Sequence, residues 1–231
     1  MTTQLAIFVI SLVLSLVLTP LAGRFGTMVG AVDEPDERKV HTRAIPRFGG
    51  AAIVVSFLLT LSFASLFMNT SVSDLLVLNK QTGLILLGAM IVFGAGLLDD
   101  LYRLKWTIKL LLQILGASAA FFAGLTISHF EFFGLGLHFG VFSYVVTVFW
   151  FLLFINAVNL IDGLDGLAAG ITFFASAVMV IFSIVIKNCL VACFFTALAG
   201  STLGFLRYNF NQKNSSQLCC GVAVFVIYST L

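Results

Sequence analysis

The chain has 231 residues, of which 60% are hydrophobic and only 10% are charged, and its mean hydropathy is +1.12. Soluble domains carry about 25% charged residues, so this composition excludes an ordinary water-soluble domain. The formal net charge of +2 is too small to indicate a nucleic-acid-binding protein. The four cysteines lack metal-ligand spacing and are interpreted as small hydrophobic residues.

Long apolar runs separated by polar breaks divide the chain into about eight candidate spans. About 20 helical residues cross the roughly 30 Å hydrocarbon core, and backbone groups in lipid must be hydrogen-bonded within the protein. We therefore expect an all-α fold, a polytopic membrane helical bundle forming one domain over residues 1–231. In chain order the expected spans are 4–22, 49–68, 82–98, 106–125, 139–158, 167–186, 189–206 and a short last one, 218–231.

Basic residues predict the orientation of these spans. All lysines and arginines except Lys80 and Lys187 fall in every second junction, and such residues mark the cytoplasmic side. The amino terminus is therefore predicted to face outward. Most of the acidic residues lie in the same junctions, which the rule for basic residues does not explain. The predicted cytoplasmic junctions are 23–48, 99–109, 157–166 and 207–217.

The stretch "GLLDDLYRLKWTIK" places Asp99 and Asp100 at the end of the third expected helix. A helix C-terminus carries partial negative charge, so two carboxylates there need a cation. One interpretation is a surface ion pair between Asp99 and Arg103, four residues on. The other is a bound Mg²⁺, which prefers carboxylate oxygen. The residues alone leave both open.

The stretch "NAVNLIDGLDGLAAG" carries a row of polar residues with a spacing of three. On one unbroken helix the first and last of them would lie on opposite faces, so a shared site requires a bend. Gly163 and Gly166 permit one, because glycine adopts backbone angles that other residues avoid. We favour a polar cup at the membrane surface over an ordinary capped turn. The row consists of Asn156, Asn159, Asp162 and Asp165.

The first long polar segment is "DEPDERKVHTRAIPRFGG", residues 33–50. Its arginines suit phosphate oxygens, which they bind through paired hydrogen bonds. A plain solvated loop is the alternative for any single residue of the segment. His129 and His138 are assigned to an outer loop without a catalytic role. The candidate phosphate-binding residues are Arg38, Lys39 and His41.

These three stretches, followed by "GFLRYNFN", resemble the polyprenyl-phosphate N-acetylhexosamine-1-phosphate transferase family (glycosyltransferase family 4) over residues 30–211. Within it the chain is most similar to undecaprenyl-phosphate N-acetylglucosamine-1-phosphate transferases, which start O-antigen, enterobacterial common antigen or teichoic acid synthesis. It is less similar to phospho-N-acetylmuramoyl-pentapeptide transferases, which show Thr-Pro-Thr-Met-Gly-Gly where residues 45–50 read Ile-Pro-Arg-Phe-Gly-Gly.

The resemblance implies a multi-pass enzyme of the bacterial inner (plasma) membrane with its active site facing the cytoplasm. Undecaprenyl phosphate would attack the β-phosphorus of a UDP-amino sugar, expected to be UDP-N-acetylglucosamine, and release UMP. Mg²⁺, with Mn²⁺ as a substitute, would reduce repulsion between the two anions. The exact sugar and the polysaccharide pathway stay open. Glycines in the third span suggest tight contacts, within one chain or in a homodimer.

The resemblance also implies roles for the individual residues. Asp99 and Asp100 would bind the metal or activate the nucleophile, and Lys109, in "KLLLQ", would contact the phosphates. The first cytoplasmic motif, with Arg38, Lys39 and His41, is assigned to substrate binding. The remaining assignments are catalysis for Asp99, Asp100, Asp162 and Asp165, metal binding for Asp99, Asp100 and Asp162, and nucleotide binding for Asn159.

The chain departs from the family after Asn211. The family typically continues with Pro-Ala-Lys-Ile-Phe-Met-Gly-Asp-x-Gly-Ser, whose aspartate binds the metal, whereas residues 212–231 diverge and no acidic residue follows Asp165. We expect a shifted frame or a truncated product that binds Mg²⁺ and substrate weakly. Two other classes are weighed against the enzyme, a transporter and a non-catalytic membrane scaffold. Transporters keep ionisable groups near mid-bilayer, and here the acids lie outside the expected spans.

Overall fold

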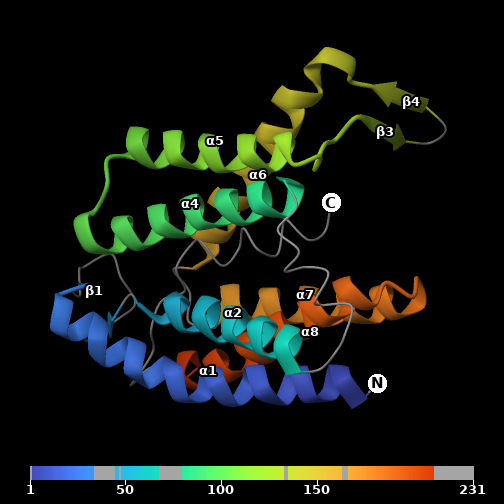
Figure 1. Ribbon diagram of the computed structural model, residues 1–231. Coiled ribbons are helices and arrows are strands. Elements are labelled where there is room, and N and C mark those ends of the chain that lie inside the picture. Colours follow the sequence, from blue (N-terminus) through green and yellow to red (C-terminus); the bar gives the residue numbers. More distant parts are fainter. Residues whose placement is uncertain are drawn as a thin grey trace.

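The computed structural model describes residues 2–33, 45–46, 48–67, 80–132, 135–162 and 166–210. The described part is a helical bundle with two small hairpins and one 3₁₀ turn (Figure 1). The helices are α1 (Thr2–Val29), α2 (Gly49–Phe67), α4 (Lys80–Tyr102), α5 (Trp106–Phe122), α6 (Ser143–Ile161), α7 (Leu167–Val185) and α8 (Cys189–Asn209). The short elements are β1 (Val32–Asp33), β2 (Ile45–Pro46), β3 (His129–Phe132), β4 (Leu135–His138) and η1 (Gly140–Phe142).

The expected polytopic membrane bundle is confirmed. Among the described residues six helices are long and apolar enough to cross a membrane, and α5 is a shorter apolar helix of 17 residues. Together they correspond to the first seven expected spans. The eighth, 218–231, lies outside the described residues. The hairpin of β3 and β4 was not predicted, because its segment had been assigned to an outer loop.

The helix α5 ends three residues before the predicted boundary at Leu125. Gly124 has φ of +98°, a left-handed conformation that suits glycine. The backbone N–H of Leu125 then donates to the carbonyl of Ala120 at 3.1 Å, and that of Gly124 donates to Phe121 at 3.0 Å. These bonds satisfy carbonyls at the helix end and turn the chain toward the hairpin.

The long helix α1 buries its polar face and exposes its apolar one. Ser11, Ser15 and Thr19 are buried at a spacing of four, and large aliphatic side chains on the other face are exposed. In a membrane protein small polar residues line helix contacts, because lipid solvates large apolar side chains as well as the protein does. The exposed face therefore fits contact with lipid. Its residues are Leu5, Val9, Val13, Val17 and Leu21.

The central helix is α8, of which 67% is buried over its most apolar window, against 22% for α1. The two run side by side in the same direction. Gly200 and Gly204, one turn apart, face the backbone of α1. Ser15 Oγ donates to the carbonyl of Ser201 at 2.6 Å, across the two helices. This is the close approach that a Gly-x-x-x-Gly spacing permits.

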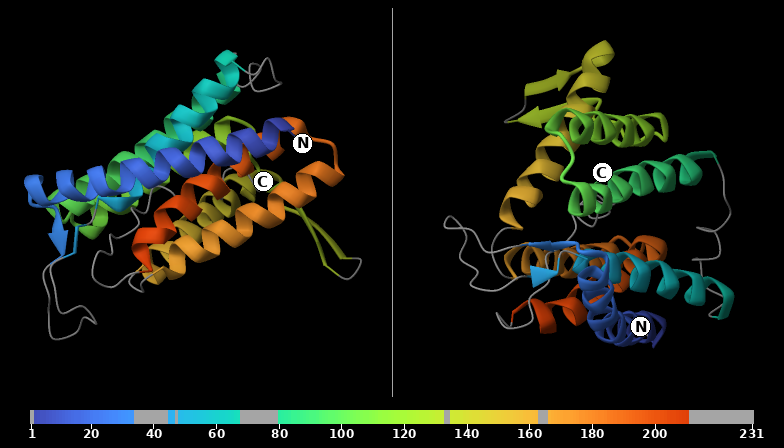
Figure 2. Two further views of the ribbon diagram at one scale, coloured as in Figure 1. Left: turned by 90° about the horizontal axis from the view of Figure 1, so that it is seen from below. Right: turned by 90° about the vertical axis from the view of Figure 1, so that its left-hand side faces the viewer.

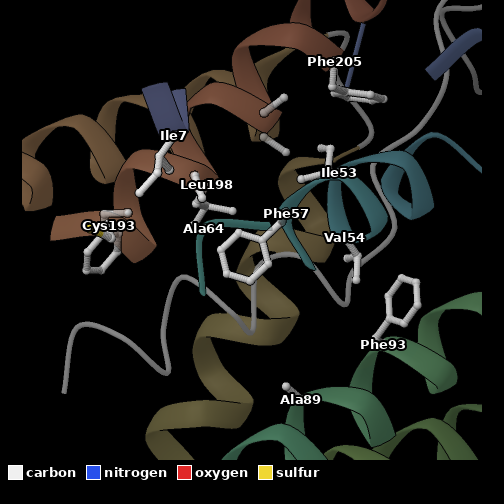
Figure 3. Close-up of a cluster of buried hydrophobic side chains, with 14 residues drawn as sticks. Ile7, Ile53, Val54, Phe57, Ala64, Ala89, Phe93, Cys193, Leu198 and Phe205 are labelled. Carbon is white, nitrogen blue, oxygen red and sulfur yellow. The ribbon is translucent and has the colours of Figure 1, made fainter. Parts of the chain in front are cut away.

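Two buried clusters organise the bundle. The larger draws on α1, α2, α4, α7 and α8 and contains Phe57, Leu198 and Phe205 (Figure 3). The smaller joins α4, α5 and α6 around Phe151. Helix α4 contributes Phe93 to the first and Val92 to the second, so it connects the two groups of helices.

Alternating passes bring the C-terminal ends of α1, α4 and α8, which border predicted cytoplasmic junctions, to one end of the bundle. The α4–α5 corner lies at the same end as the C-terminus of α1, while the N-terminus and the β3–β4 hairpin lie at the other (Figures 1 and 2). At the junction end a methyl group on Gly166 would contact Phe210, so α7 begins where α8 ends. The end that carries Asp99 and Lys109 is therefore shared by several helix ends.

Candidate active site

Asp99 closes the sharp corner between α4 and α5. Its carbonyl accepts the backbone N–H of Arg103 at 2.9 Å, and its Oδ1 accepts the N–H of Leu104 at 3.1 Å. Arg103 has φ of +48°, so the helix stops at Tyr102. The Asp99 side chain therefore accepts the backbone N–H of Leu104, which has no helical carbonyl partner after the helix ends.

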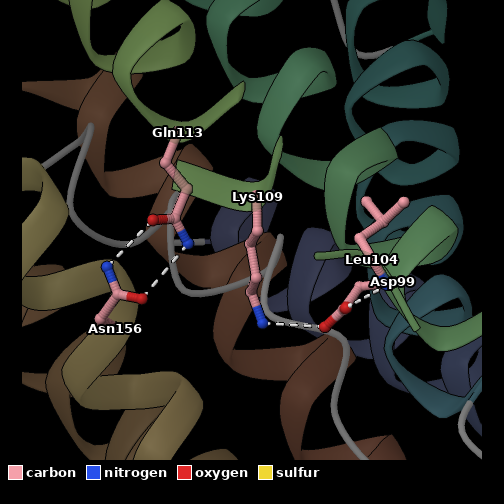
Figure 4. Close-up of polar contacts among 5 residues, drawn as sticks. All are labelled: Asp99, Leu104, Lys109, Gln113 and Asn156. Carbon is pink, nitrogen blue, oxygen red and sulfur yellow. Dashed lines mark hydrogen bonds and ion pairs between the residues drawn. The ribbon is translucent and has the colours of Figure 1, made fainter. Parts of the chain in front are cut away.

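The second oxygen of Asp99 forms an ion pair with Lys109, one turn into α5. The distance between Oδ2 and Nζ is 2.8 Å (Figure 4). The side chains are 26% and 18% exposed, so the pair is only partly screened by solvent. The sequence left open an ion pair of Asp99 with Arg103 or a bound Mg²⁺. The structure has an ion pair, and its cation is Lys109 instead of Arg103. An i,i+4 pair needs an unbroken helix, and this helix ends before Arg103.

One turn deeper, an amide pair joins α5 to α6. Asn156 Nδ2 donates to Gln113 Oε1 at 3.0 Å, and Gln113 Nε2 donates back to Asn156 Oδ1 at 3.5 Å (Figure 4). Asn156 Nδ2 also donates to the carbonyl of Leu152 at 2.8 Å. Gln113 is 2% exposed, so an unmatched amide there would be costly. Gln113 lies four residues after Lys109, on the same face of α5.

The C-terminal half of α6 carries the predicted polar row toward the same end. Asn159 is one turn beyond Asn156, and Asp162 is the C-cap residue, its N–H donating to Val158 at 3.0 Å. Both are half-buried. The predicted break within this row is confirmed, since α6 ends at Ile161, before Asp165, and Gly166 has φ of +72° at the start of α7.

The structure thus brings part of the predicted site together. Asp99 and Lys109 are paired at the α4–α5 corner, and the Gln113–Asn156 contact joins α5 to the part of α6 that precedes Asn159 and Asp162. The Oδ2 atom of Asp100 is buried at the end of α4. Sequence reasoning gave no role to Gln113 or to its contact with Asn156. The available signal was an amide four residues after Lys109 in an otherwise apolar helix. Outside the described residues lie the predicted site residues Arg38, Lys39, His41 and Asp165.

The metal assignment of Asp99, Asp100 and Asp162 stays a prediction. Their oxygens are the donors that Mg²⁺ prefers, so the donor chemistry fits. Among the described residues, however, no three His, Cys, Asp or Glu side chains gather closely enough to hold a metal ion. In the described arrangement the carboxylate of Asp99 accepts bonds from Lys109 and from the N–H of Leu104.

Residues 82–225 match the family described as glycosyl transferase family 4, and the chain belongs to this family. It is 34% identical over 206 residues to a Bacillus subtilis (strain 168) protein named "Probable undecaprenyl-phosphate N-acetylglucosaminyl 1-phosphate transferase", covering 88% of this chain and 55% of that one. It is 33% identical over 164 residues to "Undecaprenyl-phosphate alpha-N-acetylglucosaminyl 1-phosphate transferase" of Thermotoga maritima, covering 71% and 47%.

A third relative carries a different name. The "Phospho-N-acetylmuramoyl-pentapeptide-transferase" of Staphylococcus carnosus (strain TM300) is 30% identical over 213 residues, covering 88% of this chain and 66% of that one. The chain spans about half the length of the Bacillus and Thermotoga relatives. The family resemblance drawn from the motifs is thereby confirmed, and the chain is a multi-pass membrane protein of this family.

Proposed function

We propose that the chain belongs to an enzyme that transfers N-acetylglucosamine 1-phosphate from UDP-N-acetylglucosamine to undecaprenyl phosphate, at the cytoplasmic face of the bacterial inner membrane. The observation that carries the proposal is the Asp99–Lys109 pair at the end of an apolar bundle, on a helix that the Gln113–Asn156 contact joins to α6. A lipid substrate and a nucleotide substrate can both reach such a site, one from the bilayer and one from water. The names of the relatives support the same substrates.

In the proposed reaction an oxygen of the lipid phosphate attacks the β-phosphorus of the UDP-sugar. A new P–O bond forms, the bond from that phosphorus to the bridging oxygen breaks, and UMP leaves with the electron pair. Lys109 would bind phosphate oxygens with its ammonium group. Asp99, held by the corner at Leu104, orients that ammonium toward the junction end. The lipid phosphate is already ionised near neutral pH, so no general base is required.

A divalent cation is part of the proposal. Asp100 and Asp162 are its proposed ligands, with Asp99 as a third once Lys109 turns to substrate. Bound Mg²⁺, or Mn²⁺ in its place, supplies positive charge between two anionic substrates. Asn159 would contact the nucleotide. The same proposal assigns Asp165 to the site and Arg38, Lys39 and His41 to the phosphates.

Two alternatives are tested in parallel. Similarity to the Staphylococcus carnosus relative favours a muramoyl-pentapeptide donor as the second candidate. A transporter is disfavoured because Asp99, Asp100 and Asp162 stand at helix ends rather than at mid-helix.

The test is a membrane assay with UDP-[¹⁴C]N-acetylglucosamine and undecaprenyl phosphate, with the Bacillus relative as the positive control. We expect label in the lipid fraction only when Mg²⁺ or Mn²⁺ is present. Preferential transfer from the muramoyl-pentapeptide nucleotide would select the second candidate. Nucleotide binding without transfer would favour a non-catalytic scaffold. Because weak binding is expected of a chain that diverges after Asn211, the assay is repeated with residues 212–231 replaced by the continuation of the Bacillus relative. Failure of both binding and transfer in that chain would overturn the proposal.

A further inference from the structure

The β3–β4 hairpin lies at the end of α5 opposite the Asp99–Lys109 pair (Figure 1). Its base is tied to α6 by two hydrogen bonds. The N–H of Ile127 donates to Thr147 Oγ1 at 2.9 Å, and Ser143 Oγ donates to the carbonyl of Ile127 at 2.8 Å. The N–H of Phe139 donates to the carbonyl of Ser128 at 3.0 Å, which closes the two strands beside α6. The first residue pair of the hairpin is therefore well anchored.

That first pair consists of two histidines. His129 and His138 are direct partners in the antiparallel register, so their side chains project from the same face. Both are exposed, and their ring centroids are 6.0 Å apart with an angle of 35° between the planes. Neutral imidazole is the commonest ligand for transition metals in proteins.

The ring separation is close to that of two ligands on one metal ion. A Zn–N bond is about 2.0–2.1 Å long and points outward from the ring, which places the centroids of two imidazoles on a tetrahedral zinc ion about 5 Å apart. From the observed 6.0 Å the rings need to approach by about 1 Å, which rotation of two exposed side chains supplies without any strand movement.

Ser128 further prepares one of the two rings. Its Oγ lies 3.2 Å from Nδ1 of His129, a distance at which either atom can be the donor. When Nδ1 donates, Nε2 carries the lone pair and is the nitrogen that a metal ion can bind. Metal-bound histidines commonly donate their other ring N–H in this way.

We propose that His129 and His138 form a site for a divalent transition-metal ion, with water completing the coordination. Among the described residues no third His, Cys, Asp or Glu joins them. The site therefore has two protein ligands, and the ion bridges the two strands of the hairpin. Glu131, two residues along on the same strand face, adds negative charge nearby. The proposal is independent of the proposed transferase activity.

The experiment uses the full chain with an affinity tag free of histidine, purified in detergent and stripped with EDTA. Zn²⁺ is titrated in competition with a chromophoric chelator. We expect a saturable site whose affinity falls at least tenfold in His129→Gln and in His138→Gln, and binding at the proposed Asp100–Asp162 site is unaffected by either change. The matched control is His41→Gln, which removes the chain's other histidine and should leave binding unchanged.

A second measurement keeps the test independent of any folding defect in the variants. With Cu²⁺ bound to the unaltered chain, electron paramagnetic resonance should show coupling to two imidazole nitrogens, and Cu²⁺ should bind more tightly than Ni²⁺ or Zn²⁺. The proposal is overturned by absence of saturable binding, by coupling to fewer than two nitrogens, or by equal binding in His138→Gln. Loss of binding in His41→Gln would assign the metal elsewhere and would overturn it too.

Discussion

Replacing Gly204 with alanine should weaken the contact between α1 and α8, although alanine has the higher helix propensity. A methyl group there would lie 2.7 Å from the carbonyl oxygen of Leu12 and 2.8 Å from Ser15 Cβ. Carbon atoms in contact are normally about 3.5–4.0 Å apart, so the helices must separate. Because the obstacle includes backbone, no side-chain rotation relieves it.

The magnitude follows from three terms. Overpacking of a tight contact costs about 1–3 kcal/mol. Separation also lengthens the 2.6 Å bond from Ser15 to Ser201, and an interhelical hydrogen bond in a membrane contributes about 0.6 kcal/mol. Alanine regains about 0.8–1.0 kcal/mol of helix propensity over glycine. The matched control is Gly94→Ala in α4, where an added methyl group meets nothing within 4 Å. Both variants gain the same helix propensity, so this gain cancels when their stabilities are compared.

We therefore expect Gly204→Ala to be less stable than Gly94→Ala by about 1.5–3.5 kcal/mol. The measurement is equilibrium unfolding in mixed detergent micelles, followed by helical circular dichroism and by a cysteine-accessibility probe. Gly200→Ala should behave like Gly204→Ala, since its methyl would lie 2.5 Å from the carbonyl of Phe8. Stabilities of Gly204→Ala and Gly94→Ala within about 0.5 kcal/mol of each other would refute the tight-contact reasoning.

Further predictions concern the site and the hairpin. Lys109→Met should lower transfer in the membrane assay by roughly 10²–10³-fold, the loss typical when one hydrogen-bond donor to a reacting oxyanion is removed. The control is Lys105→Met, because Lys105 is exposed in the corner. Equal activities of the two variants would remove Lys109 from the site. Asn156→Leu should destabilise the bundle by about 1–2 kcal/mol because the buried amide of Gln113 is left behind, and Gln113→Leu should cost less because Asn156 is exposed and keeps its bond to Leu152. The double variant should lose less than the sum of the two; additive losses would mean that the two amides do not interact. Thr147→Val removes the acceptor of the Ile127 N–H and should raise hydrogen exchange at that amide, and unchanged protection would contradict the proposed anchor.

The end of the bundle that carries Asp99 and Lys109 could be predicted from the sequence, although the contacts there could not. Both residues sit beside apolar runs, so their common end followed from counting passes through the membrane. The roles assigned to the site residues stay predictions. The sequence did not predict which basic residue forms an ion pair with Asp99. The choice between Arg103 and Lys109 depends on one residue, Arg103, adopting a left-handed backbone conformation that ends the helix.

The sequence by itself determined the helices of this protein, because lipid offers no hydrogen bonds and each apolar run must satisfy its own backbone. It also determined the family, through motifs whose order does not depend on packing. Only the tertiary structure decided which helices touch. The pairing of Gly204 with α1, the amide contact between Gln113 and Asn156, and the facing of His129 and His138 all join residues that local periodicity cannot relate. Such contacts depend on small-residue fit and on strand register, and these are properties of the assembled bundle.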